Sequence, residues 1–547
     1  MSPHTAPPRM TCHGDPTLVY ALRELDVPTA YNFVDASLTR NVSEYGDRSA
    51  CHFIRADGTV ESTTWRALND RVNQLGAGLR ARGVSVGDRV LIGVRECPDL
   101  VACVMAVMRM GAVVVPFSAM ARRREVADFV ARVHPRALIC DSNLADELGP
   151  LSGGVDVVVY SSADATGRAT LDNLAGAAGP CTAPTSRDDL AVIFHTSGTT
   201  GRPKLCPHSQ RALAAEAQLA CRYNYRLSAS DVVCSIGPAV HAFGFLGKVQ
   251  YPLHTGASTV LMEEVSPRSV AVALEELRAT HLVSGTMMWK RLLLTPTPPD
   301  MSSVKYLESL GPGDAVFQQL AAMGHHPRNS FGMVPLNGYI TMVGYDEPLG
   351  SLGRALPGYE VYVVSTDRSE AFDDRGFPVE LPPGEIGRLA LRGPTGIRYI
   401  DDPDQAAADV VNGWSLLDDV FERDEAGYLW WRGRLSNVIK TNGYGVSPVE
   451  VEEVLALHPA VVEAAVFGTA DDERGELVTA VVHLSAGCEP SDETVRELQA
   501  FVKSQLAPYK YPRRIEFVDA IPTDQLGKVR YAELKQRIAA TPALQDL

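Results

Sequence analysis

Short, continuous apolar runs alternate with longer stretches of helical apolar spacing along the first part of the chain. From Arg89 the sequence reads RVLIGV, then PDLVACVMAVMRM, and from Gly111 it reads GAVVVPF. This predicts a buried strand, an apolar helix, a glycine stop and a second strand. REVADFVARV predicts another helix, and RALICD, VDVVVYSS and LAVIFH (residues 190–195) predict further strands. This order of elements predicts a parallel sheet that is covered by helices.

The same alternation continues beyond residue 204, and it changes toward the C-terminus. HSQRALAAEAQLACRYN predicts a long helix, whereas DVVCSIG, STVLME and HLVSGT predict strands. At residues 354–396, GYEVYVVSTD and IGRLALRG lie between glycine and proline turns and predict a mainly β subdomain. The last stretch restarts with the helical SPVEVEEVLALHPAV and contains the strands LVTAVVHL and RRIEFVD, which predicts a small α+β domain.

We therefore predict an α/β protein of two domains. The large N-terminal domain, residues 1–434, contains parallel-rich sheets covered by helices together with the β subdomain. The small C-terminal α+β domain covers residues 437–547, and the hinge between the two domains lies at residues 435–436. A chain of 547 residues is too long for one ordinary hydrophobic core, so its length alone predicts two or more packing units.

Composition and charge exclude several classes of protein. With 45% hydrophobic and 21% charged residues and no apolar run of about 18 residues, the chain is predicted to be soluble, with no membrane partner. Its start, MSPHTAPPRM, lacks the apolar region of a signal peptide, so a cytoplasmic location is expected. The ten cysteines contain no C-x-x-C pair, which argues against a zinc ribbon or a disulfide framework. A net charge of −15 disfavours nucleic acid as a partner.

The segment HTSGTTGRPK, residues 195–204, follows directly on a predicted strand. Triphosphates are bound by backbone N–H groups that glycines leave accessible, by hydroxyl donors and by a cationic side chain, and the segment contains all three. It is not a Walker A loop, because G-K-[ST] is missing, and a plain connecting turn explains the same composition. Its candidate phosphate contacts are Thr196, Ser197, Gly198, Thr199, Thr200, Gly201 and Lys204.

Further stretches, in fixed order from about residue 30 to residue 535, resemble the adenylate-forming superfamily of acyl-CoA ligases, luciferases and nonribosomal peptide synthetase adenylation domains. SGTTGRPK resembles the P-loop signature of that family, GPAVHAFGF its acyl-pocket histidine segment, and PGDAV its adenine-lining stretch. The ribose-binding region of the family is similar to WSLLDDVFERDEAGYLWWRGR. The loop of its pantetheine tunnel is similar to IKTNGYGVSP, and the segment of its C-terminal catalytic lysine is similar to QLGKVRY. Three further segments are most similar to benzoate- and 2-aminobenzoate-CoA ligases, and they read ALPGYEVYVV, GRLALRGPTGIRYIDDPDQ and APYKYPRRIEFVDAIP.

The resemblance implies an AMP-forming acid–thiol ligase that activates an aryl carboxylic acid, similar to benzoate or aminobenzoate, with ATP and Mg²⁺. The acyl adenylate would then pass its acyl group to the thiol of coenzyme A or, as the alternative acceptor, to the phosphopantetheine of an acyl carrier protein. The resemblance also implies that the small C-terminal domain is mobile and swings about the hinge between the two steps. No metal ligand is assigned.

The resemblance also places roles on individual residues. The candidate catalytic residues are Lys528, His241 and Lys440, although a solvated lysine and a packed histidine are the plainer interpretations of such residues. The candidate nucleotide and pantetheine contacts are Gly313, Asp314 and Ala315 at adenine, Asp419 and Arg434 at the ribose, and Gly443 at the pantetheine arm. The acyl pocket is expected to be lined by His241, Phe243, Gly338 and Tyr339, since planar acids pack against aromatic faces and glycine floors.

Several segments depart from the family pattern. In the family's Y-G-x-T-E run, the threonine contacts phosphate and the glutamate helps to bind Mg²⁺. We compare it with NGYIT at residues 337–341, which puts Ile340 at the threonine and Thr341 at the glutamate. A one-residue slip would put Met342 at the glutamate, so the carboxylate is missing either way. The other departures are Leu205 after the P-loop lysine, Leu417 and Asp418 in place of the threonine and glycine of T-G-D, and Ser436 at the hinge.

The missing carboxylate leaves two alternatives to the ligase open. The same scaffold could be an acyltransferase that takes a preformed acyl-CoA or acyl-AMP and passes the acyl group to a carrier protein, an amine or a hydroxyl. A non-catalytic, nucleotide-binding regulator is the other alternative. Retention of the P-loop, Lys528, Asp419 and Arg434 favours the ligase over the transferase, because a pure transferase would have little need for them. A non-catalytic regulator predicts loss of the lysines, and they are present.

Overall fold

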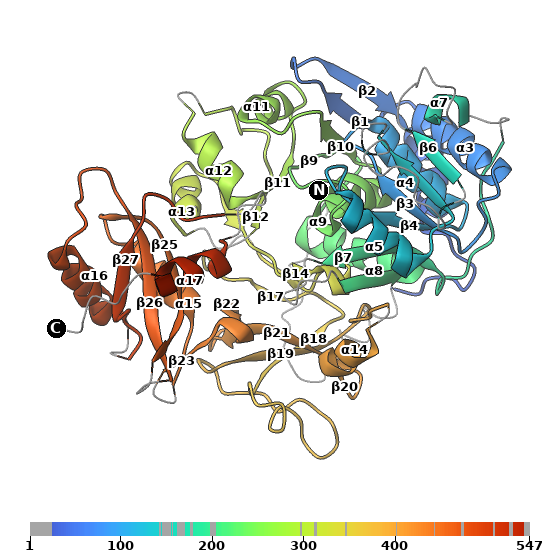
Figure 1. Ribbon diagram of the computed structural model, residues 1–547. Coiled ribbons are helices and arrows are strands. Elements are labelled where there is room, and N and C mark those ends of the chain that lie inside the picture. Colours follow the sequence, from blue (N-terminus) through green and yellow to red (C-terminus); the bar gives the residue numbers. More distant parts are fainter. Residues whose placement is uncertain are drawn as a thin grey trace, which may run out of the picture.

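The computed structural model arranges the chain in a large N-terminal part and a smaller C-terminal lobe that carries β23 to α17 (Figure 1). The fold is α/β, as predicted, whereas the boundary residues of the two domains stay predictions. The residues that the structure describes are 25–141, 144, 155, 157–160, 170–174, 179–196, 204–295, 298–310, 314–344, 347–400, 402–441, 444–471, 475–506, 509–523 and 529–540.

The alternating runs between Arg89 and Ser209 form a six-stranded sheet in the order β6-β5-β3-β4-β7-β8. Its strands are β3 (Arg89–Gly93), β4 (Val113–Pro116), β5 (Ala137–Cys140), β6 (Val157–Tyr160), β7 (Leu190–Thr196) and β8 (Lys204–Ser209). All neighbours are parallel except β7 and β8, which are antiparallel. After helix α4 (Pro98–Arg109), Gly111 has a φ of 80°, the left-handed value at which glycine ends a helix without strain. The predicted parallel sheet and glycine stop are thus confirmed.

A second, seven-stranded sheet has the order β13-β12-β11-β9-β10-β1-β2. It is parallel apart from the hairpin of β1 and β2. Its strands are β1 (Ser49–Ile54), β2 (Val60–Thr64), β9 (Val232–Ser235), β10 (Ser258–Met262), β11 (His281–Gly285), β12 (Tyr306–Leu310) and β13 (Pro327–Arg328). The carboxyl ends of these strands are where parallel sheets bind ligands.

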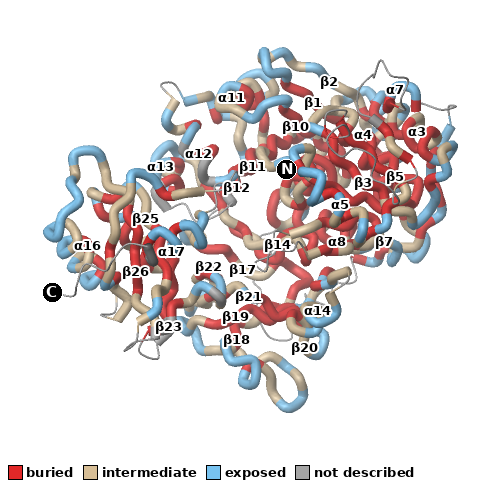
Figure 2. Tube along the Cα trace, in the orientation of Figure 1, coloured by how far each residue is buried: buried red, intermediate tan, exposed pale blue. Residues whose placement is uncertain are grey.

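Helices fill the space between the two sheets and cover their outer faces. The largest buried core joins both sheets through α2 (Phe33–Tyr45), α3 (Trp65–Ala81), α4 and α8 (Gln210–Leu219). Helix α5 (Arg123–Val133) covers the six-stranded sheet, and α11 (Pro267–Glu275), α12 (Thr286–Leu293) and α13 (Asp314–Ala322) cover the seven-stranded one. Figure 2 shows the resulting concentration of buried residues around β3, β5 and α4. The shorter helices here are α7 (Leu171–Leu174), α9 (Ala242–Phe245) and α10 (Tyr251–Thr255).

The predicted long helix after the P-loop is present. It runs as α8 to Leu219 and continues as one π-helical turn, Ala220–Asn224. A second π-turn, Leu246–Gln250, links α9 to α10. Two small hairpins follow, β14 (Gly332–Met333) with β15 (Gly338–Tyr339), and β16 (Thr341–Met342) with β17 (Arg354–Ala355).

The β subdomain is an antiparallel sheet in the order β18-β19-β21-β20, with β22 also paired to β21. Its strands are β18 (Glu360–Val364), β19 (Ile386–Arg392), β20 (Val410–Val411), β21 (Trp414–Arg423) and β22 (Leu429–Arg434), and helix α14 (Pro403–Asp409) precedes β20. The predicted β subdomain is therefore present, and it extends to the end of β22.

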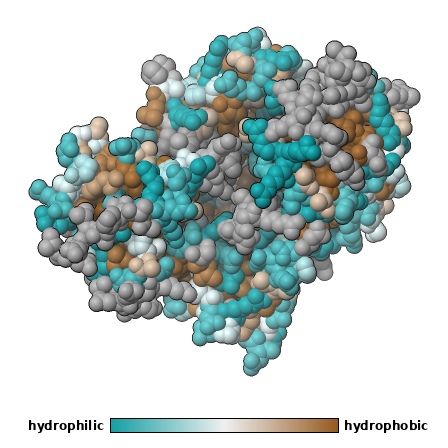
Figure 3. Space-filling model, in the orientation of Figure 1, coloured by the Kyte–Doolittle hydropathy of each residue, from teal (hydrophilic) through white to brown (hydrophobic). Residues whose placement is uncertain are grey.

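The C-terminal lobe is α+β, as predicted, and has its own core. Its strands are β23 (Ile439–Thr441), β24 (Tyr444–Val446), β25 (Val461–Asp471), β26 (Gly475–Leu484) and β27 (Arg514–Phe517), and its helices are α15 (Pro448–Ala456), α16 (Asp492–Gln505) and α17 (Tyr531–Ala540). On the face shown in Figure 3, hydrophobic side chains form separate areas among hydrophilic ones. Within the described ranges, no helix has the length and apolarity that crossing a membrane requires.

Candidate active site

The predicted phosphate loop joins two neighbouring strands of the six-stranded sheet. Thr196 ends β7, Lys204 begins β8, and the antiparallel register sets these two residues opposite each other. The loop residues between them lie outside the described part of the chain, and they include Ser197, Gly198, Thr199, Thr200 and Gly201. Leu205, where the family has glycine, is fully buried in the core beneath α5. The larger side chain therefore packs inward rather than toward a ligand.

Asp419 and Arg434 are direct cross-strand partners in β21 and β22. The indole Nε1–H of Trp431 donates to Asp419 Oδ1 at 2.9 Å, and Arg434 Nε lies 3.8 Å from the same oxygen. The Asp419 side chain is 13% exposed, whereas that of Arg434 is 47% exposed. A carboxylate held by an indole beside a more exposed cation can accept hydrogen bonds from ribose hydroxyls. The two ribose candidates are thus brought together, and their role stays a prediction.

His241 is the residue directly before α9 and lies two residues before Phe243. Its ring lies 6.0 Å, between centroids, from that of His195, the residue that precedes the phosphate loop on β7. Burial, reinforced by the nearby charges of His241 and Arg132, lowers the pKa of His195 to about 4, so this imidazole is neutral at pH 7. The candidate acyl-site histidine therefore adjoins the P-loop strand.

The three other pocket candidates lie together. The rings of Phe243 and Tyr339 meet edge to face with centroids 5.7 Å apart, and Tyr339 is buried with its hydroxyl accepting from Tyr225 at 2.9 Å. Gly338 has a φ of 149°, and a Cβ there would stand 2.3 Å from Oε1 of Glu216. Only glycine fits between this carboxyl and Tyr339, which gives the glycine floor a packing reason.

Glu216, on α8, is a residue that sequence reasoning missed. It is fully buried, accepts from Gln250 Nε2 at 2.7 Å and from the Tyr251 hydroxyl, and burial raises its pKa to about 8. A neutral carboxyl therefore stands directly behind Gly338 at pH 7. The only signal for it was a glutamate within the apolar run LAAEAQLA.

NGYIT, the segment that we compared with Y-G-x-T-E, is buried throughout. Thr341 is fully buried and its Oγ1 accepts from the Phe331 N–H at 2.7 Å, and Ile340 is fully buried in the core of the β subdomain. The partly exposed segment lies just upstream, at residues 331–334. FGMVP at 331–335 also fits the pattern Y-G-x-T-E, and it puts Val334 at the threonine and Pro335 at the glutamate.

The carboxylate that the family uses toward Mg²⁺ is therefore missing in this register as well. Across the described ranges, no three His, Cys, Asp or Glu side chains are grouped closely enough to hold a metal ion. Mg²⁺ keeps water and phosphate oxygens as ligands in many nucleotide sites. The protein contributes no carboxylate from residues 331–335, so phosphates and water would have to supply those ligands here.

The remaining candidates are only partly described. Asp314 and Ala315 begin α13, and Lys440 is the central residue of β23, where it pairs with Gly445. Gly313, Gly443 and Lys528 lie outside the described residues.

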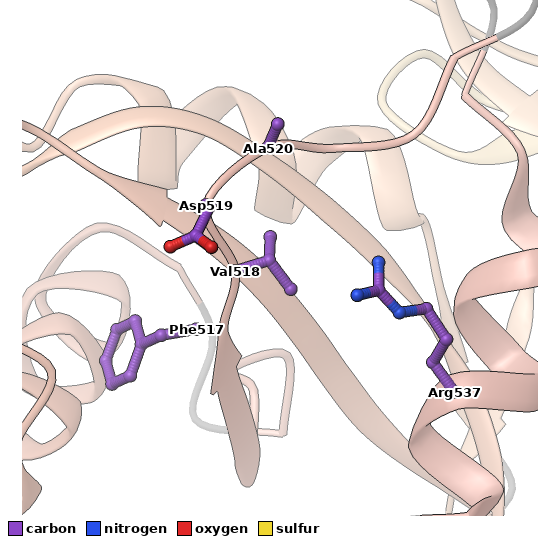
Figure 4. Close-up of a pocket in the computed structure, with 5 residues that line it drawn as sticks. All are labelled: Phe517, Val518, Asp519, Ala520 and Arg537. Atoms are coloured by element: carbon purple, nitrogen blue, oxygen red, sulfur yellow. The ribbon is translucent and has the colours of Figure 1, made fainter.

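A cavity of about 380 Å³ lies in the C-terminal lobe, between the end of β27 and α17. It is lined by Phe517, Val518, Asp519, Ala520 and Arg537, and Arg537 extends from α17 toward Val518 (Figure 4). None of the predicted site residues lines this cavity, so we do not assign it to the nucleotide or the acyl group.

Comparison with known proteins establishes the family. Residues 38–399 match the AMP-binding enzyme family and residues 450–528 match the C-terminal domain of AMP-binding enzymes. A benzoate–CoA ligase from Thauera aromatica is 28% identical, with 93% of this chain and 97% of the relative covered. Two solved structures are also similar. The anthranilate CoA ligase AuaEII in complex with anthranoyl-AMP has a TM-score of 0.83 at 26% identity, covering 94% of this chain and 99% of that one. The amide bond synthetase McbA from Marinactinospora thermotolerans has a TM-score of 0.79 at 28% identity, covering 92% and 99%.

The chain belongs to the AMP-binding enzyme family, whose members form the adenylate-forming superfamily. Within it, the chain is an ATP-dependent, AMP-forming acid–CoA ligase by class.

Proposed function

We propose that this ligase activates an aromatic carboxylic acid of the benzoate or 2-aminobenzoate type. In the first step, a carboxylate oxygen attacks the α-phosphorus of ATP, the bond to the β-phosphate oxygen breaks, and pyrophosphate leaves. In the second step, the thiol sulfur of coenzyme A attacks the acyl carbon and AMP leaves. No covalent protein nucleophile is needed, so positioning and charge stabilisation carry the catalysis.

The observation that carries the nucleotide half of this proposal is the direct pairing of Asp419 with Arg434. The carboxylate would accept the ribose hydroxyls, while Thr196 and Lys204, which flank the loop, would hold the phosphates that leave. Lys528 would neutralise the negative charge that the substrate carboxylate and the α-phosphate bring together. His241 lies beside the P-loop strand, next to the aromatic candidates.

The aromatic ring of the acid is proposed from the edge-to-face pair of Phe243 and Tyr339. Flat rings pack well against such a pair. A benzoate–CoA ligase and an anthranilate CoA ligase among the similar proteins support the same substrate class.

One observation favours a second candidate function. Val334 and Pro335 provide neither hydroxyl nor carboxylate where the family contacts phosphate and Mg²⁺. On this alternative, the protein accepts a preformed acyl-CoA or acyl adenylate and passes the acyl group to an amine, a hydroxyl or a carrier-protein thiol. The amide bond synthetase among the similar structures supports an amine as the acceptor in that case.

The deciding experiment measures pyrophosphate release with a panel of benzoates, aminobenzoates, hydroxybenzoates and short fatty acids, with and without coenzyme A. We expect release that depends on an aromatic acid and falls by at least about a hundredfold in Lys528→Ala, because one charge contact to a transition state is worth several kcal/mol. Wild-type protein that releases no pyrophosphate from any acid, yet transfers acyl groups from an acyl-CoA, would refute the ligase in favour of the transferase.

A further inference from the structure

Lys204, the last residue of the predicted phosphate loop, is held by two neighbours from the β subdomain. Its Nζ lies 3.7 Å from Oδ2 of Asp409 and 5.1 Å above the centre of the Tyr399 ring. A separation of 3.7 Å is too long for a hydrogen bond, so the contact with Asp409 is ionic and uses none of the three N–H donors of the ammonium. The Lys204 side chain is 18% exposed, and its two contacts with described residues, Asp409 and Tyr399, leave its donors available to another anion.

Asp409 is held in place independently of Lys204. It is the last residue of α14, nearly buried, and each of its oxygens accepts from a neutral donor. The Tyr399 hydroxyl donates to Oδ2 at 2.8 Å, and Gln405 Nε2 donates to Oδ1 at 2.7 Å. The backbones are linked too, because the N–H of Ile400 donates to the carbonyl of Leu205 at 2.9 Å. Tyr399 directly precedes Ile400, and Lys204 directly precedes Leu205. This backbone hydrogen bond therefore sets Tyr399 and Lys204 side by side.

Asp409 also belongs to a row of alternating charges. Burial lowers the pKa of Arg388, and the negative charges of Asp418 and Asp409 oppose that effect. Arg388 Nη2 donates to Asp418 Oδ1 at 3.0 Å. The charges therefore alternate in sign along a row of four residues, which are Lys204, Asp409, Arg388 and Asp418. The row begins at the last residue of the phosphate loop and ends at the residue before Asp419. A nearly buried carboxylate with a cation on either side has its charge compensated by ionic contacts.

We propose that Asp409 is a positioning residue for ATP. Together with Tyr399 it holds the Lys204 ammonium at the start of β8, where its donors can bind the β- and γ-phosphates. This inference rests on the proposed function, because the phosphate contact of Lys204 is part of that function. The opposite effect, in which the Asp409 charge repels the phosphates, would make the Asp409→Asn variant bind ATP more tightly.

The test compares ATP and AMP binding by calorimetry in wild type, Asp409→Asn and Tyr399→Phe, with the full-length chain. We expect Asp409→Asn to weaken ATP binding about tenfold and Tyr399→Phe to weaken it less, because the phenyl ring keeps the ring contact and the Asp409 charge. AMP, which lacks the β- and γ-phosphates, should bind all variants equally. Glu380→Gln is the matched control, since Glu380 pairs with Arg423 at 2.9 Å in the same subdomain and outside the charge row.

The outcomes separate the inference from the function on which it rests. Unchanged or tighter ATP binding by Asp409→Asn would overturn the positioning role, and so would an equal loss of ATP and AMP, which is the mark of a structural defect. If Asp409→Asn does not fold, Tyr399→Phe alone decides, since it leaves every charge in place. Wild type that binds no ATP and releases no pyrophosphate would overturn the proposed function, and the inference with it.

Discussion

Among single residues, Glu216 is the least expected feature of the acyl side of the site. Its carboxyl is enclosed by α8, Gln250, Tyr251 and the backbone of Gly338. A charged carboxylate in such surroundings would need far more compensation than these neutral donors provide, and the group is therefore protonated near neutral pH. The buried acid acts as a packing and hydrogen-bonding element behind Gly338.

The protonation of Glu216 predicts a pH dependence of stability. Its pKa rises from 4.5 to about 8 on folding, so the folded state keeps a proton that the unfolded chain releases above pH 4.5. The stabilisation is complete below that pH and is lost as the pH rises toward about 8. Burial raises the pKa of Glu308 to about 7, which acts in the same direction. Buried neutral histidines such as His195 act in the opposite direction below about pH 6.5. We therefore expect a difference between variants: from pH 5 to 8, the Tm of wild type should fall relative to that of Glu216→Gln in thermal melts.

The control for this prediction is Glu276→Gln, because Glu276 is exposed at the end of α11. It should leave the slope of Tm against pH unchanged. A slope that is the same in wild type and Glu216→Gln would show that Glu216 is ionised in the folded protein, contrary to its burial.

At the scale of elements, the β21–β22 hairpin carries two tryptophans that cap two different carboxylates. Trp431 Nε1 donates to Asp419 at 2.9 Å, and Trp430 Nε1 donates to Asp424 at 3.0 Å near the turn. We expect Trp431→Phe to raise the KM for ATP about fivefold, since one hydrogen bond that orients the ribose carboxylate is worth about 1 kcal/mol. Trp430→Phe removes the same kind of bond at the other end of the hairpin and should leave this KM unchanged. Equal effects of the two variants in steady-state kinetics would count against a ribose role for Asp419.

Local patterns predicted the elements well where burial and periodicity agree. The apolar runs at Arg89 and Leu190 are strands β3 and β7. The pairing of Asp419 with Arg434 depends on a register shift between Val420 and Phe421, which no local pattern predicts. NGYIT at 337–341 was misjudged because FGMVP at 331–335 matches the same pattern, and only three-dimensional packing shows which of the two is buried. Glu216 was missed for the same reason, since a helical glutamate looks exposed until a second sheet covers it.

The whole molecule adds contacts that no local pattern reveals. Tyr399 and Asp409 lie about two hundred residues beyond Lys204, yet they hold its side chain, because the β subdomain packs against the end of the six-stranded sheet. Between the two domains, Arg432 on β22 lies 3.6 Å from Glu453 on α15, and the Ser447 hydroxyl donates to the Arg432 carbonyl at 2.6 Å. These contacts stabilise one arrangement of the C-terminal lobe beside β22.

The proposed swing of the C-terminal lobe gives a prediction at this scale. Arg434 is extended, with φ −107° and ψ 146°, and Leu435 is the first residue of the 3₁₀ turn Leu435–Asn437, so a proline fits at Leu435 in this arrangement. Leu435→Pro should lock φ there and restrict the swing. We expect one half-reaction to keep its rate and the other to fall at least about tenfold, because only one of the two arrangements tolerates the locked angle.

The two half-reactions can be measured apart, as ATP–pyrophosphate exchange and as thioester formation from a preformed acyl adenylate. Leu435→Ala removes the same side chain without fixing φ, and it should leave both rates near those of wild type. Equal slowing of both steps by Leu435→Pro would indicate local damage, and no slowing of either would mean that the swing does not pass through this residue. A selective loss would locate the hinge at the end of β22, because the proline changes the freedom of one backbone angle and leaves both sets of site residues unaltered.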